Sequence, residues 1–456
     1  RFAEIAALYY TEQQRLYGKA DFYSMDPFHE GGSVKDVDLR AAGEAIMREM
    51  KRVNPAAVWV AQSWQECPYP DMISSLHNGD MLVLDINSET QPQWGDPDSS
   101  WKRVDGFSGH DWAFCMLLNF GGNVGMYGKL QHVIDEYYKA RDSRFATTLR
   151  GVGLTMEEID NNPVMYELVT ELPWRQHRFD WQEWLRGYVT ARYGVAANAK
   201  VQEAWLLLAR SVYGASAKVA EQGCHESVLC ARPALDVYQV SSWSMMEEYY
   251  NPDDVIRAAR LMVEASHEMP ANANFRYDLV DVTRQAIAEQ ARLVYDEVVA
   301  AYRAKDRRMF AHASQRFLDI LLQQDRLLSS MPGFMVGSWI GQARTLGTTA
   351  DERDRYEWNA RVQITTWGNR EAAERGRLRE YAHKEWSGVL HDFYYPRWKA
   401  YFEALAATFD GRPMQPIDFY AMDEKWTLQH NAYPCTAQGD AVEFAQEAFR
   451  KVFDTE

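Results

Sequence analysis

Two glutamates, Glu30 and Glu157, come directly after short apolar runs of the sequence, where a strand would give way to a loop. Glu30 follows the run FYSMDPF and His29, and it precedes two glycines whose missing side chains leave room for a ligand. Glu157 follows the run LRGVGLT. Two carboxylates on opposite sides of a bound sugar can cleave a glycosidic bond, one as proton donor and the other as nucleophile or base. The pair therefore suggests glycoside hydrolysis.

Three further acidic residues compete for these roles, since Asp26 and Asp85 lie near the ends of such runs and Glu89 follows one. Each of the five carboxylates could equally be a solvated surface acid. Catalysis needs two carboxyls in unlike environments. The acid of such a pair must be kept protonated, by burial or by the negative charge of its partner, and the other carboxylate must stay ionised through hydrogen-bond donors.

Short apolar runs alternate with helical stretches over about the first 175 residues. The runs are FYSMDPF (22–28), VWVAQSW (58–64), MLVLDIN (81–87), WAFCMLLNF (112–120) and LRGVGLT (149–155). This alternation predicts a parallel sheet with both faces covered, either doubly wound or formed by the later strands of a (β/α)8-type barrel. The sequence has no GxGxxG or Walker motif, which favours the barrel. In a barrel the carboxyl ends of the strands share one catalytic face, so the polar residues after the runs should converge.

The rest of the chain has helical periodicity without strand signals. The helices we predict are Trp181–Tyr193, Val255–Ser266, Tyr277–Lys305, Arg307–Leu328, Glu371–Phe393 and Trp398–Phe409. The fold class is therefore α/β followed by all-α. We expect residues 1–176 to form the C-terminal part of a catalytic barrel, and residues 177–456 to form an all-helical domain.

The overall charge limits the classes of partner. The 65 acidic residues outnumber the 49 Lys and Arg residues, which gives a net charge of −16 at pH 7. Such a field repels phosphate backbones and anionic membrane surfaces, so we do not expect nucleic acid as a partner. The sequence also has no apolar run long enough to insert into a membrane. Aromatic residues make up 13% of the chain, which leaves rings available to line a cleft for a flat ligand such as a carbohydrate.

The five cysteines show neither a CxxC pair nor the spacing of a zinc site. Cys224 and Cys230 are six residues apart, and they could form a disulfide in an oxidising compartment or remain free thiols. The sequence has no N-x-S/T glycosylation site, which favours a bacterial periplasmic or extracellular protein over a glycosylated eukaryotic one.

A colinear set of motifs extends along nearly the whole chain. It consists of FYSMDPFHEGG, VWVAQSW, LVLDINSE, WAFCMLLNFGGNVGMYG and GVGLTMEEI, followed by ELPW, ARYG, FRYDLVDVTRQA, GSWIGQAR, TTWG and YYPRW. In this the chain resembles the α-N-acetylglucosaminidases, glycoside hydrolase family 89. The resemblance implies a (β/α)8-type barrel followed by a helical domain, and the retaining hydrolysis of terminal α-linked N-acetylglucosamine. It implies no metal and no organic cofactor.

Carried over residue by residue, the family's acid/base falls on Glu30 and its nucleophile on Glu157. With these roles, we expect Glu30 to be kept protonated by burial or by the negative charge of Glu157, and Glu157 to stay ionised through hydrogen-bond donors. The aromatic wall of the sugar pocket is similar to Trp64 on the barrel side and to Trp367 and Tyr381 in the helical domain. An aromatic ring offers its face to the C–H surface of a pyranose, and a Tyr adds a hydroxyl. The alternative for the two Trp residues is ordinary core packing.

Three polar residues near these positions are further candidates for sugar binding. Asn119 and Asn123 flank a pair of glycines, and they could donate to ring hydroxyls or simply complete a turn. His29 stands where many relatives have Asn, so hydrogen bonding to the sugar or the acid could differ there. His29 could also be a packed residue at the end of a strand.

The family's barrel begins well before the segment that Arg1 matches, so about three early strands have no counterpart here. We therefore expect the chain to be the C-terminal portion of the enzyme, and an upstream segment or chain to complete the barrel. Two other functions stay open. One is an exo-glycosidase of the same fold acting on another α-hexosamine, and the other is an inactive carbohydrate-binding remnant.

Overall fold

A computed structural model describes residues 2–99, 101, 103–122, 125–157, 161–194, 198–216, 223–237, 239–242, 248–269 and 271–454. The chain forms two compact units. The first comprises Arg1–Leu118, Lys129–Met156 and Val164–Arg178, and the second comprises Asn119–Gly128, Glu157–Pro163 and Phe179–Glu456. Two short segments of the N-terminal region, 119–128 and 157–163, thus belong to the same unit as the C-terminal helices.

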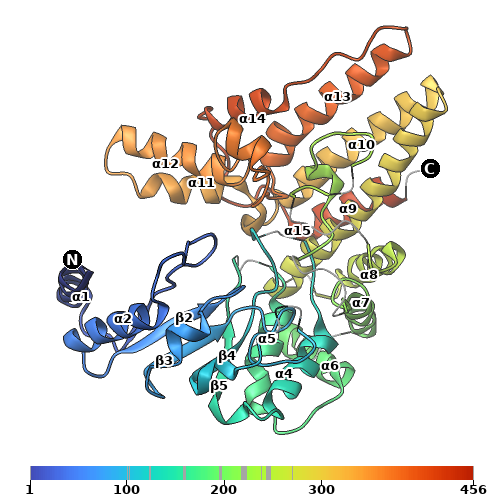
Figure 1. The fold of residues 1–456 in the computed structure, drawn as a ribbon. Helices are drawn as coiled ribbons and strands as arrows, with labels where there is room; N and C mark the ends of the chain where they lie inside the picture. Colours follow the sequence, from blue (N-terminus) through green and yellow to red (C-terminus); the bar gives the residue numbers. More distant parts are fainter. Residues whose placement is uncertain are drawn as a thin grey trace. The chain divides into compact units, whose positions relative to one another are not determined.

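The first unit contains a parallel five-stranded sheet (Figure 1). Its strands are β1 (Phe22–Ser24), β2 (Val58–Ser63), β3 (Met81–Asp85), β4 (Asp111–Met116) and β5 (Leu149–Leu154). Each apolar run predicted as a strand contains one of them. The spatial order follows the chain order, and every neighbouring pair is parallel. A doubly wound sheet reverses its order at a switch point, so this arrangement is the one that a barrel requires.

Helices connect the strands of the first unit. The helix α2 (Leu39–Val53) lies between β1 and β2 in the chain, and α4 (Leu130–Arg141) lies between β4 and β5. The Asp38 side chain starts α2 by accepting a hydrogen bond from the backbone N–H of Ala41 at 3.0 Å. The shorter helices α3 (Pro70–Ile73) and α5 (Pro163–Glu171) follow β2 and β5. Fully buried aromatic side chains on the strands, Trp59, Trp112 and Phe114, supply much of the core.

The N-terminal helix α1 (Phe2–Tyr17) packs against α2 but leaves apolar side chains exposed. Its Tyr10 ring meets Tyr23 of β1 edge to face, with the ring centroids 5.3 Å apart. The exposed apolar residues of α1 and the start of β1 are Phe2, Ile5, Leu8, Tyr9, Leu16, Tyr17 and Phe22. Within the described residues this apolar face of α1 remains open to solvent.

Two buried carboxylates, Asp85 and Glu89, anchor loops at the carboxyl end of β3. Asp85 accepts hydrogen bonds from the backbone N–H groups of Gln93 at 2.8 Å and Trp94 at 3.0 Å. Glu89 accepts from the N–H of Leu118 at 2.8 Å and from that of the preceding residue at 3.0 Å. Burial raises the pKa of each carboxyl to about 7, although the backbone donors oppose that shift. These contacts favour a structural role for Asp85 and Glu89, two of the three competitors of the catalytic pair.

The second unit is helical in its described part, apart from loops and short turns. Its helices are α6 (Trp181–Tyr193), α7 (Ala199–Arg210), α8 (Pro252–Ala265), α9 (Ala273–Arg303), α10 (Arg307–Leu328), α11 (Val336–Thr345), α12 (Ala350–Gln363), α13 (Tyr395–Thr408), α14 (Phe419–Thr427) and α15 (Ala441–Phe453). The long α9 is central, since α8, α10 and α15 all pack on it (Figure 1). None of the helices in the described ranges combines the length and apolar character that a membrane crossing needs.

The helix predicted over Glu371–Phe393 is wrong. The structure has one turn of π-helix at Glu371–Arg375 and another at Leu390–Tyr394, with irregular backbone between them. Arg377 and Glu380 have left-handed backbone angles, with φ of 57° and 58°. The Glu380 side chain is buried and forms an ion pair with Arg397. A tertiary ion pair thus overrides the helical propensity of this segment.

Cys224 and Cys230 are both buried and carry free thiols, so the structure contains no disulfide between them. Burial raises the pKa of the Cys224 thiol to about 12. Of the two alternatives for these cysteines, the free thiols are the one found.

The two buried carboxylates predict how stability depends on pH. A pKa raised above the unfolded value means that the folded state holds more protons between about pH 4 and 7, so the free energy of unfolding falls as pH rises through this window. The slope is up to about 1.4 kcal/mol per pH unit for each group. Asp85→Asn should flatten the dependence, as measured by urea unfolding at pH 5, 6, 7 and 8.

The matched control is Asp142→Asn, whose carboxylate is exposed at the end of α4. It should keep the slope of the unsubstituted protein. An unchanged slope in Asp85→Asn would show that folding does not raise the pKa of Asp85.

Candidate active site

The carboxylate of Glu157 is held by two donors of the second unit. The backbone N–H of Gly121 donates to Oε2 at 2.5 Å. The hydroxyl of Tyr381 donates to the same oxygen at 2.9 Å and lies 3.2 Å from Oε1. Both donors bind the carboxylate form, which is the form that a nucleophile needs. The expected hydrogen-bond donors to Glu157 are therefore present.

The loop that supplies the Gly121 donor fits closely against the segment that carries Tyr381. Gly121 has a φ of 63°, and a Cβ at this position would lie 1.9 Å from the carbonyl oxygen of Tyr381. Only glycine tolerates both conditions. The buried ammonium of Lys384 donates to the carbonyl of Gly122, which holds the loop from its other end.

Trp367 and Tyr381, both predicted to line the sugar pocket, lie side by side in the second unit. Their ring centroids are 5.1 Å apart, and the planes are inclined at 64°. Both rings are half-buried, so part of each face is free to meet a ligand. The structure therefore brings together three of the predicted site residues, Glu157, Trp367 and Tyr381.

Asn119 lies in the same unit but is almost completely buried. Its side-chain amide donates to the Oδ1 of Asn161 at 3.3 Å, which ties the 119–122 segment to the 157–163 segment. Asn123 lies outside the described residues.

Glu30 lies on a tight loop of the first unit and is exposed there. The backbone is left-handed at Phe28, Glu30 and Gly31. A Cβ on Gly32 would lie 2.4 Å from the Cα of Phe28, so this glycine is needed by the turn itself. A Cβ on Gly31, in contrast, would have no atom within 4 Å, so the space expected beside this loop is present at Gly31, whereas the burial expected for Glu30 is not found within its own unit.

Asp26 and His29 stand beside this loop. Asp26 accepts a hydrogen bond from the backbone N–H of Gln62 at 2.6 Å, which joins the end of β1 to β2. Burial raises the pKa of Asp26, while the Gln62 donor and His29 oppose the shift. The Nε2 of His29 is buried and has no hydrogen-bond partner among the described residues. Asp26 thus has a structural contact, and His29 is partly packed.

Trp64 follows β2 in a turn closed by two backbone hydrogen bonds with Cys67, each 3.0 Å long. Its half-buried ring meets Trp101 edge to face, with the centroids 4.8 Å apart. A cavity of about 520 Å³ lies next to this turn, lined by Gln65, Glu66, Tyr69, Pro70, Gln93, Trp101 and Arg103. Sequence reasoning missed Trp101, because it lies in a long loop and not directly after a strand.

Two groups of His and carboxylate side chains in the described residues are close enough together to bind a cation. They are His225, Glu248 and Glu289, and Asp354, Glu357 and His430. Glu357 already pairs with Arg344 and Arg361, and Glu289 already accepts a hydrogen bond from the hydroxyl of Tyr250. Neither group contains a residue of the candidate active site.

Comparison with known proteins places these residues in a family. Residues 1–176 match the family model described as the alpha-N-acetylglucosaminidase (NAGLU) tim-barrel domain, and residues 184–451 match the model of the C-terminal domain. The human protein named alpha-N-acetylglucosaminidase is 33% identical over 470 residues, which cover 99% of this chain and 60% of the human protein.

Solved structures agree with this match. A family 89 glycoside hydrolase from Clostridium perfringens, in complex with 2-acetamido-1,2-dideoxynojirmycin or with PUGNAc, has a TM-score of 0.91 and 31% identity. The alignment covers 99% of this chain and 51% of that one. A double Glu-to-Gln variant from Clostridium perfringens, in complex with its substrate GlcNAc-alpha-1,4-galactose, has a TM-score of 0.90 and 30% identity. It is matched over 98% of this chain and 50% of its own.

The chain spans about half the length of these solved structures. The family models cover nearly all of it, in the order that the motifs indicated, and they confirm the resemblance seen in the sequence. The chain belongs to the alpha-N-acetylglucosaminidases, glycoside hydrolase family 89.

Proposed function

We propose that the protein is a retaining exo-α-N-acetylglucosaminidase, which removes terminal α-linked N-acetylglucosamine from glycans. The observation that carries the proposal is the carboxylate of Glu157, bound by the N–H of Gly121 and the hydroxyl of Tyr381. The human relative's name supports the reaction, and the substrate of the Clostridium perfringens relative supports the terminal sugar.

In the proposed mechanism Glu157 attacks the anomeric carbon and forms a covalent glycosyl-enzyme. Glu30 protonates the leaving oxygen and then takes a proton from the water that hydrolyses the intermediate. The two donors to Glu157 fix the direction of its carboxylate. Less entropy is then lost when the carboxylate takes the orientation needed for attack. The two carboxylates supply both the proton and the nucleophile, so the proposal needs no metal or organic cofactor.

We propose that Trp64, Trp367 and Tyr381 contact the apolar faces of the sugar, and that His29 offers a polar group beside the acid. Asn119 supports the same site indirectly. Its hydrogen bond to Asn161 holds the loop whose Gly121 N–H donates to Glu157. The helical domain would then contribute to the active-site cleft. An enzyme of the same fold for another α-hexosamine, or an inactive carbohydrate-binding remnant, is the alternative that substrate tests must separate.

We further propose that residues 1–176 are the C-terminal part of a (β/α)8-type barrel, completed by an upstream segment or chain. Two features support this. The sequential parallel sheet has β1 and β5 as edge strands in its described part, whereas a closed barrel has no edges. The helix α1 also contacts the edge strand β1 through Tyr10 and Tyr23, and an added strand and helix would cover its exposed apolar side chains.

Substitution of each carboxylate tests the mechanism. In the complete enzyme, with the early barrel strands supplied, Glu157→Gln and Glu30→Gln should each lower kcat on an aryl α-N-acetylglucosaminide by about a thousandfold. The loss in Glu30→Gln should be much smaller for a dinitrophenyl leaving group, which departs without protonation. Glu157→Ala should regain turnover with added azide and give the β-glycosyl azide, in which the anomeric configuration is inverted.

Glu183→Gln, at an exposed position on α6, is the matched control and should keep full activity. Full activity in Glu157→Gln would refute the assignment. Faster hydrolysis of another aryl α-hexosaminide would favour the second enzyme, and sugar binding without any hydrolysis would favour the remnant.

Replacement of Trp367 tests whether its ring contacts the sugar. Trp367→Ala should lower kcat/KM by about ten- to a hundredfold through a higher KM, because a ring in a cleft contributes mainly contact area. The melting temperature should change little, as measured by calorimetry. Trp358→Ala, at an exposed position on α12, is the control. A large loss of melting temperature with an unchanged KM would show that Trp367 is a core residue.

Supplying the remaining strands tests the proposed barrel. The 456-residue chain by itself should self-associate and be inactive, because edge strands and the apolar face of α1 are open. A segment with the early barrel strands of a family member, fused or added as a separate chain, should restore a monodisperse and active protein in light-scattering and activity assays. A chain that is monomeric, cooperatively folded and active alone would overturn the proposal.

A further inference from the structure

The segment that carries Trp367 and Tyr381 is not held by regular secondary structure. It connects α12 with the turn of π-helix at Leu390–Tyr394, and it contains three non-glycine residues with positive φ. These are Trp367 at 60°, Arg377 at 57° and Glu380 at 58°. Such backbone conformations persist only where the surroundings impose them. Contacts outside the segment must therefore fix its shape.

One backbone hydrogen bond joins the start of this segment to Glu380, and another ties Trp367 to the end of α12. The N–H of Glu380 donates to the carbonyl of Thr365 at 2.6 Å, and the N–H of Trp367 donates to the carbonyl of Val362 at 2.8 Å. Tyr381 is the residue directly after Glu380, whose N–H makes the first of these bonds. The position of its hydroxyl depends on how Glu380 is held.

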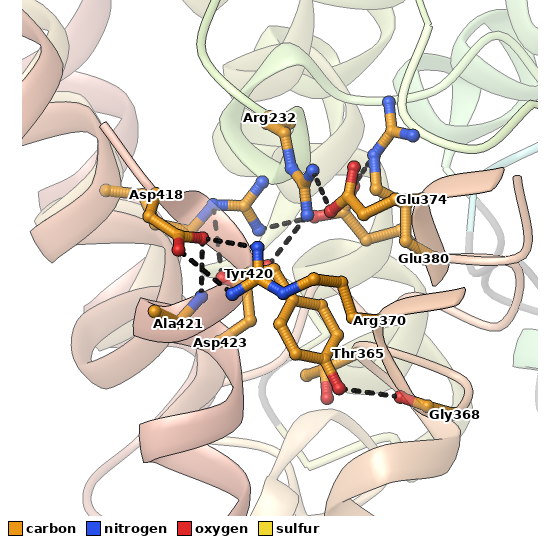
Figure 2. Close-up of polar contacts among 12 residues, drawn as sticks. Arg232, Thr365, Gly368, Arg370, Glu374, Glu380, Asp418, Tyr420, Ala421 and Asp423 are labelled. Atoms are coloured by element: carbon orange, nitrogen blue, oxygen red, sulfur yellow. Dashed lines mark hydrogen bonds and ion pairs between the residues drawn. The ribbon is translucent and has the colours of Figure 1, made fainter. Parts of the chain in front are cut away.

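A buried set of charges holds Glu380. Its carboxylate accepts a hydrogen bond from Arg397, and both side chains are about 1% exposed. The Nε of Arg397 lies 3.7 Å from Asp423, which accepts a hydrogen bond from Arg232 at 3.0 Å. Arg232 also donates to Glu374 at 2.6 Å, and Figure 2 shows its guanidinium between the two acidic partners. The cluster binds the segment at both Glu374 and Glu380.

A second set of contacts holds the chain next to Trp367 (Figure 2). Arg370 makes two hydrogen bonds of 2.9 Å with Asp418, the residue that caps α14. The hydroxyl of Tyr420 donates to the carbonyl of Gly368 at 3.3 Å. The helix α14 therefore fixes the residues that follow Trp367, while Asp423 of the same helix belongs to the buried cluster.

Stability alone does not account for this arrangement. A buried ion pair loses its hydration and often contributes no net stability compared with apolar residues of the same volume. The reason that the geometry offers for these buried charges is orientation. Glu380 immediately precedes the residue whose hydroxyl binds Glu157.

We propose that Glu380 and Arg397 are positioning residues of the glycosidase. They hold the backbone that directs the Tyr381 hydroxyl to Glu157 and sets the Trp367 ring beside it. They act through Tyr381 and do not touch the reacting atoms. The inference rests on the proposed function.

A double-mutant cycle tests this in whichever form of the protein hydrolyses the aryl α-N-acetylglucosaminide. Glu380→Gln and Tyr381→Phe should each lower kcat by about ten- to a hundredfold, with less than a threefold change in KM. The double variant should be no slower than the slower single variant, because both changes remove the same donor. Arg397→Lys keeps the charge and should retain more activity than Arg397→Met.

Asp278→Asn is the matched control. Asp278 forms another buried ion pair of the second unit, with Arg192, and its side-chain partners among the described residues are Arg192 and Tyr193. It should lower the melting temperature while leaving kcat nearly unchanged, and its effects should be additive with those of Tyr381→Phe. If Glu380→Gln does not fold, Arg397→Lys takes its place in the cycle.

Hydrogen exchange gives a readout that does not depend on activity. Glu380→Gln should speed amide exchange in peptides covering residues 364–383, and Asp278→Asn should not. Additive losses of kcat in the cycle, or unchanged exchange in these peptides, would overturn the proposal. A protein that hydrolyses no α-N-acetylglucosaminide would instead refute the proposed function, and the exchange measurement would still decide whether the cluster holds the segment.

Discussion

The placement of the Glu157 carboxylate depends on the absence of a side chain at Gly121. Only without a Cβ does the 119–122 loop come close enough to Tyr381 for a backbone N–H and a phenol to meet on one carboxylate. The buried Lys384 contact and the Asn119 bond to Asn161 then keep the loop in place. A steric condition at one residue thus decides the electrostatics of the candidate nucleophile.

Charge is used differently in the two units. In the first unit, Asp85 and Glu89 are buried against backbone N–H groups, and burial raises the pKa of both to about 7. In the second unit, Glu380 is paired with an arginine that is itself almost completely buried. Backbone amides anchor loops at the end of the sheet, whereas guanidinium groups, with several donors in a fixed plane, fix an irregular segment. Both arrangements hold segments of the chain that lack regular secondary structure.

Much of the first unit could be predicted, because buried parallel strands are short runs of apolar residues that stand out in the sequence, as in MLVLD of β3. Helices with Asp or Asn caps, such as α6 and α10, could also be predicted from the sequence, and the predicted bounds of these two are confirmed. The segment around Glu380 was not, because its shape depends on Arg397 and Asp423, which no local pattern reveals. Glu30 and Glu157 were found from strand ends, and their separate roles came from the family resemblance. The Tyr381 contact with Glu157 joins residues 224 positions apart, beyond the reach of periodicity.

The two early segments that belong to the helical unit also have a consequence for synthesis. Residues 119–128 and 157–163 leave the ribosome long before the partners that complete their surroundings, since Tyr381 follows Glu157 by 224 residues. At about 5–20 residues per second, this delay is roughly 10 to 45 seconds. During that time the strands β1 to β5 can pair while the carboxylate of Glu157 still lacks its phenol donor. Formation of the candidate active site is therefore one of the last events in the production of this chain.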